Sequence, residues 1–239
     1  MKEGLERLIL ALDVERPDEG RDLLTSLAGG LKYVKIGHQL YARGGMRFLH
    51  EVMGMGFYIF LDLKLHDIPN TILQAVDALA REGLWALTLH CAGGRRMLEE
   101  ARRARDMCGS KLFLLGVTVL TSFDEASWDE VAPGCPLSSA LEKRAALCRQ
   151  TGMDGIVCSP LDLATVRAEG SGLFTVVPGV RPESASDDQA RAATPARAIE
   201  EGADYIVVGR PILRSADRAA AVERIALDIE EGLGCRKKR

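Results

Sequence analysis

The chain lacks the patterns of several common classes of protein. None of its six cysteines belongs to a CxxC pair or lies at ligand spacing from a histidine, and no HxH or HExxH pattern occurs. These absences argue against zinc and a disulfide framework, and they are typical of a reducing compartment. No apolar run approaches transmembrane length, and the N-terminus has no apolar signal core. We therefore expect a cytoplasmic protein without a metal site.

The sequence also lacks a strong charge bias. Its 31 basic and 34 acidic residues are mixed along the chain and give a net charge of -3. This balance gives no sign of a surface for nucleic acid or for a membrane. The one basic run, residues 236–239, is typical of a solvated tail. With 239 residues, 47% of them hydrophobic, the chain is long enough for one large domain.

Short apolar runs alternate with amphipathic segments from one end of the sequence to the other. Eight strands, each followed by a helix, predict an α/β fold, a single (β/α)8 TIM barrel over residues 1–239. A doubly wound open sheet is the alternative, but the turn after the first strand lacks a GxGxxG fingerprint. The expected strands are 8–13, 33–37, 58–64, 86–91, 112–120, 155–159, 174–179 and 205–209, and the expected helices lie near 18–29, 39–54, 70–82, 94–107, 137–151, 161–169, 194–202 and 217–232.

Three charged side chains lie close together at the end of the third expected strand. Residues 60–71 read Phe-Leu-Asp-Leu-Lys-Leu-His-Asp-Ile-Pro-Asn-Thr and contain Asp62, Lys64 and Asp67. Alternate side chains of a strand share a face, so Asp62 and Lys64 are expected to point the same way. Charges that emerge from an apolar run are costly to desolvate unless they are paired. The motif favours a catalytic carboxylate–ammonium array over a surface ion-pair turn.

Charged residues also occur in the first two expected strands. Asp13 ends the first strand, and Lys35 lies in the second between two aliphatic residues. If the large aliphatic side chains face the helices, the charged ones point into the barrel at its C-terminal end, where barrel active sites are built. We therefore expect Asp13, Lys35, Asp62 and Lys64 to converge on one site.

Other strand ends carry groups suited to a phosphorylated substrate. The eighth strand ends in Gly209 and Arg210; a glycine admits a ligand to the backbone N–H, and an arginine can bind phosphate oxygens in a fork. Barrels often hold phosphate beside the loops after strands seven and eight. Residues 121–122 and 177–181 also end strands, although ordinary turn chemistry explains them without a barrel. His66 and His90 lie in no nucleophile pattern, and we favour structural roles for both.

Together these motifs resemble those of the bacterial orotidine 5'-phosphate decarboxylase family over the full length of the chain. The decamer from Asp62 to Thr71 is the most specific of them. The other matching stretches are Ala11-Leu12-Asp13, Val34-Lys35-Ile36-Gly37, Val117-Thr118-Val119-Leu120-Thr121-Ser122, Pro178-Gly179-Val180-Arg181-Pro182 and Gly209-Arg210-Pro211.

The resemblance implies a reaction that needs no cofactor. The family decarboxylates orotidine 5'-phosphate (OMP) to uridine 5'-phosphate (UMP) and CO2, the last step of de novo pyrimidine nucleotide synthesis. By resemblance, Lys64 donates a proton to C6 of the pyrimidine, and Asp62 lies against the departing carboxylate. Lys35 and Asp67 complete an alternating network of ammonium and carboxylate groups.

The resemblance further implies how the substrate is bound. Asp13 and Lys35 match ribose-binding positions, and Ser122 matches the group that reads the pyrimidine amide. The family also implies a homodimer in which three residues reach into the partner subunit's site. Those three are Asp67, Ile68 and Thr71; the matching phosphate ligands are Gly209, Arg210 and Gln189, and Thr121 and Arg181 match other substrate contacts. The spacing from Arg181 to Gln189 is one residue shorter than in the resembling proteins.

Two alternatives stay open on the sequence alone. A phosphosugar enzyme on the same barrel, such as hexulose-phosphate synthase, would need a divalent metal, so its activity would respond to a chelator. A non-catalytic nucleotide-binding protein would bind UMP tightly without turnover.

Overall fold

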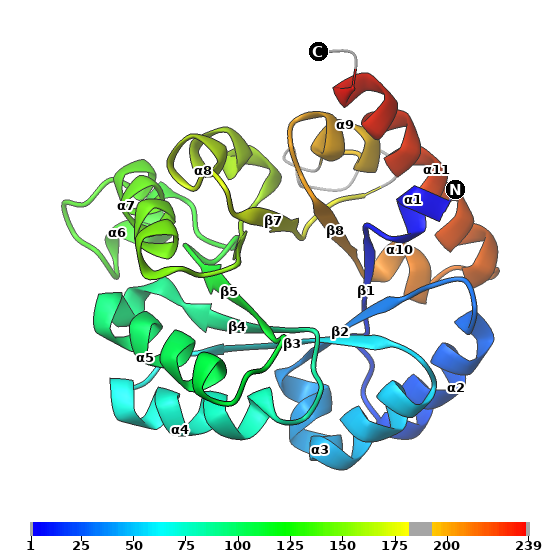
Figure 1. Ribbon diagram of the computed structural model, residues 1–239. Coiled ribbons are helices and arrows are strands. Elements are labelled where there is room, and N and C mark those ends of the chain that lie inside the picture. Colours follow the sequence, from blue (N-terminus) through cyan, green and yellow to red (C-terminus); the bar gives the residue numbers. More distant parts are fainter. Residues whose placement is uncertain (1, 182–192, 238–239) are drawn as a thin grey trace. The chain divides into compact units, whose positions relative to one another are not determined.

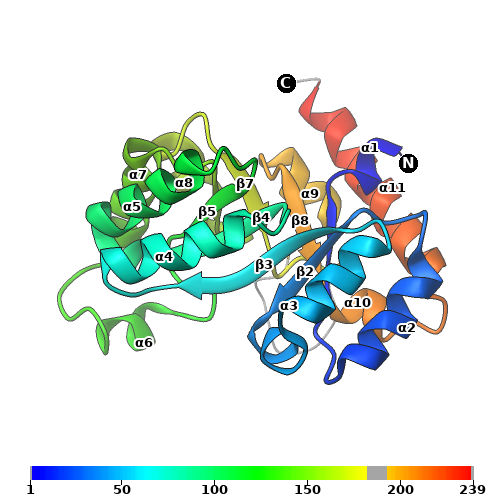
Figure 2. The same ribbon diagram turned by 60° about the horizontal axis from the view of Figure 1, so that its bottom comes forward.

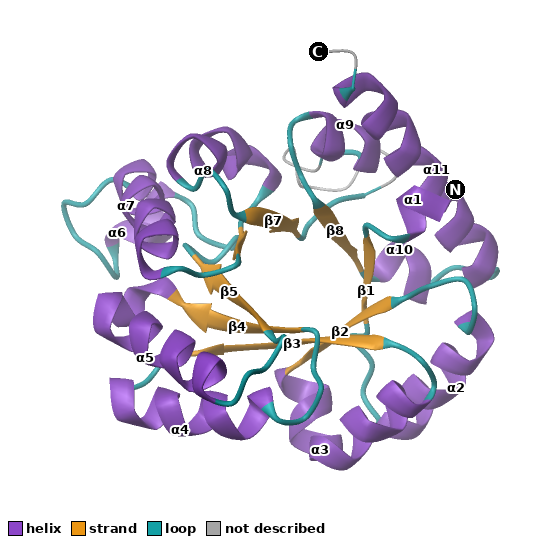
Figure 3. Cartoon of the chain, in the orientation of Figure 1, coloured by secondary structure: helices purple, strands orange, loops and turns teal. Residues whose placement is uncertain are grey.

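The computed structural model describes residues 2–181 and 193–237. Eight parallel strands follow one another in chain order as a closed barrel, which confirms the expected (β/α)8 fold. Helices alternate with the strands along the chain (Figure 3). The strands are β1 (Leu8–Ala11), β2 (Tyr33–Gly37), β3 (Tyr58–Leu65), β4 (Ala86–His90), β5 (Phe113–Val117), β6 (Gly155–Val157), β7 (Phe174–Val177) and β8 (Tyr205–Val208). The helices are α1 (Lys2–Leu5), α2 (Pro17–Leu27), α3 (His38–Gly54), α4 (Pro69–Ala80), α5 (Gly94–Met107), α6 (Glu125–Asp129), α7 (Leu137–Thr151), α8 (Leu163–Glu169), α9 (Pro195–Glu200), α10 (Arg210–Leu213) and α11 (Arg218–Arg236), with 3-10 turns η1 (Cys91–Gly93) and η2 (Pro160–Asp162).

The chain divides into two compact units. The first comprises residues 1–63 and 177–239, and the second comprises residues 64–176. Strand β3 runs across this division between Leu63 and Lys64. The expectation of one domain over residues 1–239 stays a prediction.

The first unit is built on β1, β2, β8 and most of β3. β1 pairs with both β2 and β8, and β2 pairs with β3 (Figure 1). All four residues of β1 are buried, whereas in β2 only Val34 and Ile36 are. This alternation leaves Lys35 on the face opposite the two aliphatic side chains, as the sequence pattern predicts.

The second unit contains β4 to β6 and most of β7, each paired with the next (Figure 2). Its strands are short and almost wholly apolar, which is typical of parallel strands covered on both faces. Gly116 in β5 leaves room for two thiols: a Cβ there would lie 2.2 Å from Sγ of Cys148 and 2.9 Å from Sγ of Cys91. The core at this point is therefore closely packed around a residue without a side chain.

The eight expected strands and the eight expected long helices are all present, with ends that differ by a few residues. Three short helices, α1, α6 and α10, were not expected, because four or five residues are too few to show a helical period. α6 lies between the expected strand 112–120 and the expected helix 137–151, and it begins with a capping box between Asp124 and Ser127. Among the described residues, no helix is long and apolar enough to cross a membrane.

Candidate active site

Three of the predicted charged residues lie together in the first unit. The Lys35 Nζ atom lies 3.3 Å from Oδ1 of Asp13 and 3.7 Å from Oδ2 of Asp62. The strand register explains this arrangement, because Lys35 pairs with Ala11 on β1, and Gly37 pairs with Asp62 on β3. The side chains of Lys35 and Asp62 are each 13% exposed, whereas that of Asp13 is 63% exposed. The structure therefore holds a largely buried ammonium between two carboxylates.

The backbone at Lys64 leaves the regular strand conformation. Its φ is 47°, and Lys64 is the one residue other than glycine with a positive φ in the described part of the chain. Such a conformation persists only where the surroundings enforce it, and it is enriched at functional sites. The backbone N–H of Lys64 donates to Oγ1 of Thr88 at 2.8 Å, and Thr88 is fully buried in β4. The simple alternation used for the sequence prediction therefore does not determine where Lys64 points.

Asp67, Ile68 and Thr71 lie at the start of α4 and are exposed. The backbone N–H of Ile68 donates to Oδ1 of Asp67 at 2.6 Å, which fixes the turn that precedes the helix. Ile68 is the N-cap residue in extended conformation, and Pro69 occupies the first helical position. The Ile68 side chain is 67% exposed.

His66 and His90 contact each other in the second unit. Their rings are stacked with centroids 5.4 Å apart, and the backbone N–H of Ala92 donates to Nδ1 of His90 at 3.2 Å. Burial, followed by the positive charge of Arg144, lowers the pKa of His90 to about 4. His90 is therefore a neutral imidazole at neutral pH, and the structural role favoured for it stays a prediction.

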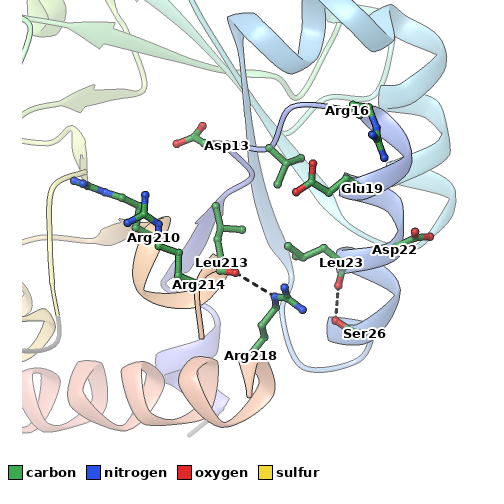
Figure 4. Close-up of a pocket in the computed structure, with 11 residues that line it drawn as sticks. Asp13, Arg16, Glu19, Asp22, Leu23, Ser26, Arg210, Leu213, Arg214 and Arg218 are labelled. Atoms are coloured by element: carbon green, nitrogen blue, oxygen red, sulfur yellow. Dashed lines mark hydrogen bonds between the residues drawn. The ribbon is translucent and has the colours of Figure 1, made fainter. Parts of the chain in front are cut away.

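A pocket of about 530 Å³ opens beside Asp13 and Arg210 in the first unit (Figure 4). Gly209 precedes Arg210, and a Cβ on it would lie 3.3 Å from Cβ of Ala11 and 3.7 Å from Oδ2 of Asp13. A side chain at position 209 would therefore crowd the end of β1. The other lining residues, which sequence patterns did not mark, are Val14, Arg16, Glu19, Asp22, Leu23, Ser26, Leu213, Arg214 and Arg218.

The remaining predicted residues lie on loops. Thr121 and Ser122 are exposed in the segment that follows β5. The backbone N–H of Arg181 donates to the carbonyl of Ala193 at 3.1 Å. Gln189 lies outside the described residues. Within residues 2–181 and 193–237, no group of three or more His, Cys, Asp or Glu side chains is arranged to hold a metal ion.

Comparison with known proteins places the chain in a family. Residues 6–225 match the family described as "Orotidine 5'-phosphate decarboxylase / HUMPS family". The chain belongs to this family. It is 42% identical to the orotidine 5'-phosphate decarboxylase of Nitrosospira multiformis over 94% of each chain, and 44% identical to that of Methylobacterium sp. over 95% of this chain and 96% of the relative. A crystal structure of the enzyme from Lactobacillus acidophilus is 33% identical, with a TM-score of 0.82 over 93% of this chain and 98% of that one.

Proposed function

We infer that this protein decarboxylates OMP to UMP and CO2. The inference rests on eight relatives that match nearly the full length of the chain. They are 38% to 44% identical to it, and each is named orotidine 5'-phosphate decarboxylase. The family description names a second group, HUMPS, beside orotidine 5'-phosphate decarboxylase, and these eight relatives favour the decarboxylase. The reaction supplies the last step of pyrimidine nucleotide synthesis, and the cysteine pattern of the sequence predicts that it takes place in the cytoplasm.

The chain's own charges suit decarboxylation at an sp² carbon without a cofactor. Loss of CO2 leaves a carbanion at C6 that the pyrimidine ring delocalises poorly, so a positioned positive charge must stabilise it. We assign this role to the ammonium of Lys64, which then protonates C6. The carboxylate of Asp62 lies against the substrate carboxylate and disfavours the bound substrate relative to the transition state. Lys35 binds the ribose together with Asp13, and its contact with Asp62 keeps that carboxylate in place.

The phosphate end of the substrate is assigned to Gly209 and Arg210. A guanidinium can form two parallel hydrogen bonds with a phosphate, and the glycine admits it to the backbone N–H. The pocket in Figure 4 supports the assignment, because Arg210 and the ribose-binding residue Asp13 both line it. Gln189 and Arg181 are proposed as further contacts to the phosphate end, and Thr121 and Ser122 as contacts to the pyrimidine end.

We also propose a homodimer in which each subunit completes the other's site. Asp67, Ile68 and Thr71 would enter the partner subunit's site. Support comes from the exposure of all three at one end of α4, including an aliphatic side chain that is 67% exposed.

The reaction is tested by following the ultraviolet absorbance of OMP with purified enzyme in excess EDTA. Rapid loss of the orotate chromophore with wild type, and none with Lys64→Ala, is expected. Activity that EDTA abolishes and a divalent metal restores would favour a phosphosugar enzyme instead. UMP binding without turnover of OMP by the wild type would indicate a non-catalytic binding protein.

The shared site is tested by mixing two inactive variants. If Lys64 and Asp67 of different subunits form one site, Lys64→Ala and Asp67→Ala homodimers are each inactive. Equilibrated mixtures then contain heterodimers with one intact site, which restores roughly a quarter of wild-type activity. No recovery in a mixture shown to exchange subunits would mean that both residues act within one subunit.

A further inference from the structure

Arg144 is a cation in the second unit that the proposed reaction does not use. It lies on α7 and is half-buried, and burial lowers the pKa of its guanidinium. Its contacts in the described part of the chain are not carboxylates: Nη1 donates to the backbone carbonyl of Thr118 at 2.7 Å, and Cζ lies 5.0 Å from the ring centroid of Trp128. Seven other arginines in the described part of the chain form ion pairs with carboxylates on the surface. Desolvating a guanidinium for a carbonyl and an aromatic face is costly, which points to a positional role.

Both contacts of Arg144 belong to the segment that carries the proposed pyrimidine-binding residues. This segment, residues 118–136, joins β5 to α7 and includes Thr121 and Ser122. In Figure 2 it extends outward around α6 before returning to α7. Arg144 contacts its first residue and, through Trp128, its middle. One guanidinium therefore joins the base of the segment to its far part.

Trp128 is the centre of a small core inside the segment. It is 4% exposed and packs with Val119 and two residues of α7, and its ring meets that of Phe123 edge-to-face with centroids 5.6 Å apart. Its Nε1–H donates to the carbonyl of Cys135 at 2.8 Å, which closes the far end of the segment. Thr121 and Ser122 lie between Val119 and Phe123, both of which belong to this core. Their position therefore depends on how the core is held.

We propose that Arg144 is a positioning residue for recognition of the pyrimidine, because it holds the segment of residues 118–136 in the conformation that presents Thr121 and Ser122. The proposal rests on the function inferred above and goes beyond it by naming a residue that touches no substrate. It predicts a selective defect. Binding of the base weakens when Arg144 is replaced, whereas binding of the phosphate end, which lies on the first unit, does not.

The matched pair of variants is Arg144→Gln and Arg149→Gln. Arg149 lies on the same helix and its Nε also donates to a backbone carbonyl, that of Glu169 at 3.0 Å, but it makes no contact with the segment. We expect Arg144→Gln to weaken UMP binding and raise KM for OMP roughly tenfold, about 1.4 kcal/mol, with no change in the inhibition constant of ribose 5-phosphate. Arg149→Gln leaves all three values unchanged. Arg144→Lys, which retains a donor, recovers part of the UMP affinity.

A fluorescence measurement tests the same contact without substrate. The chain has 2 tryptophans, so Trp85→Phe leaves Trp128 as the sole reporter. In this background, Arg144→Gln should shift the emission of Trp128 to the red and increase its quenching by acrylamide, whereas Arg149→Gln should not.

The two measurements separate the possible failures. If wild type does not decarboxylate OMP, the proposed function is wrong, and the fluorescence result still decides whether Arg144 holds the segment. If wild type is active but Arg144→Gln binds UMP normally, or loses ribose 5-phosphate affinity to the same degree, the positioning role is refuted. Unchanged Trp128 emission would refute it as well.

Discussion

Replacing Thr88 with valine tests how the structure holds Lys64. The Thr88 hydroxyl accepts the backbone N–H of Lys64 at 2.8 Å, and that residue has a φ of 47°. Valine has the same branched shape as threonine, so the substitution opens no cavity. Its main effect is to leave the N–H of Lys64 without this acceptor.

The expected loss of stability is small. A buried donor left without its partner costs about 1–3 kcal/mol. The N–H of Lys64 is only part-buried, so the lower end, about 1 kcal/mol, applies. For a protein of this size each kcal/mol lowers Tm by about 2–4 °C. Thermal unfolding of Thr88→Val should therefore begin only a few degrees below wild type.

The expected loss of activity is much larger. Without the hydrogen bond, the backbone of Lys64 relaxes toward an ordinary φ, and the ammonium moves away from C6. A displacement of about 1 Å at a reacting group lowers the rate by as much as about 10²-fold. We expect kcat of Thr88→Val to fall by one to two orders of magnitude, roughly, in the OMP absorbance assay.

Thr175→Val is the matched control. Thr175 is 1% exposed in β7 of the same unit, and its hydroxyl accepts from Nη2 of Arg167 at 3.3 Å, so the substitution removes a comparable hydrogen bond. It should lower Tm and leave kcat unchanged. If Thr88→Val keeps wild-type kcat, or if both variants lose it equally, the hydrogen bond does not orient Lys64.

Three further predictions concern other parts of the molecule. Lys35→Met should abolish measurable turnover in the absorbance assay, because it removes the cation between two carboxylates; a turnover near wild type would contradict that role. Gly116→Ala should lower the free energy of unfolding in urea by about 1–3 kcal/mol through overpacking, because its Cβ would lie 2.2 Å from Sγ of Cys148. Cys148→Ala in the same chain should restore much of this free energy, and no recovery would show that the loss does not come from this contact. The pKa of His90 is lowered from 6.5 to about 4, so between these values only the unfolded chain binds the proton; stability is complete above pH 6.5 and falls as the pH drops toward 4. The decrease in Tm from pH 7 to pH 4.5 should be smaller in His90→Asn than in wild type. Equal decreases would show that His90 does not contribute to the pH dependence of stability.

The arrangement of strands was predictable because the apolar runs are short, regular and separated by amphipathic segments. Parallel strands covered on both faces need little more than this pattern. The position of Lys35 followed from the same rule, since its two aliphatic neighbours are buried and leave it on the opposite face. The carboxylate contacts of Lys35 then follow from the strand register. These parts of the site depend only on local alternation and on the order of the strands.

Arg144 was not predictable in the same way. On a helix such as α7, one arginine among several exposed polar residues gives no local signal, and Arg149 looks equivalent in the sequence. The difference lies in what faces each guanidinium. Arg144 meets the carbonyl of Thr118, 26 residues away, and an aromatic ring, whereas Arg149 meets a carbonyl at the end of the next helix. Contacts at such separations depend on tertiary packing.

Lys64 was predictable from the sequence in one respect and not in another. Its charge, at the end of an apolar strand beside two carboxylates in sequence, marked it as a candidate without any structure. Its orientation could not be obtained from the same alternation, because the pleat that applies to Lys35 no longer applies where φ is positive. The backbone N–H of Lys64 donates instead to a hydroxyl on β4, 24 residues further along the chain. The choice of Lys64 as the proposed proton donor therefore rests on local information, whereas its orientation is a property of two strands together, and Thr88→Val separates the two.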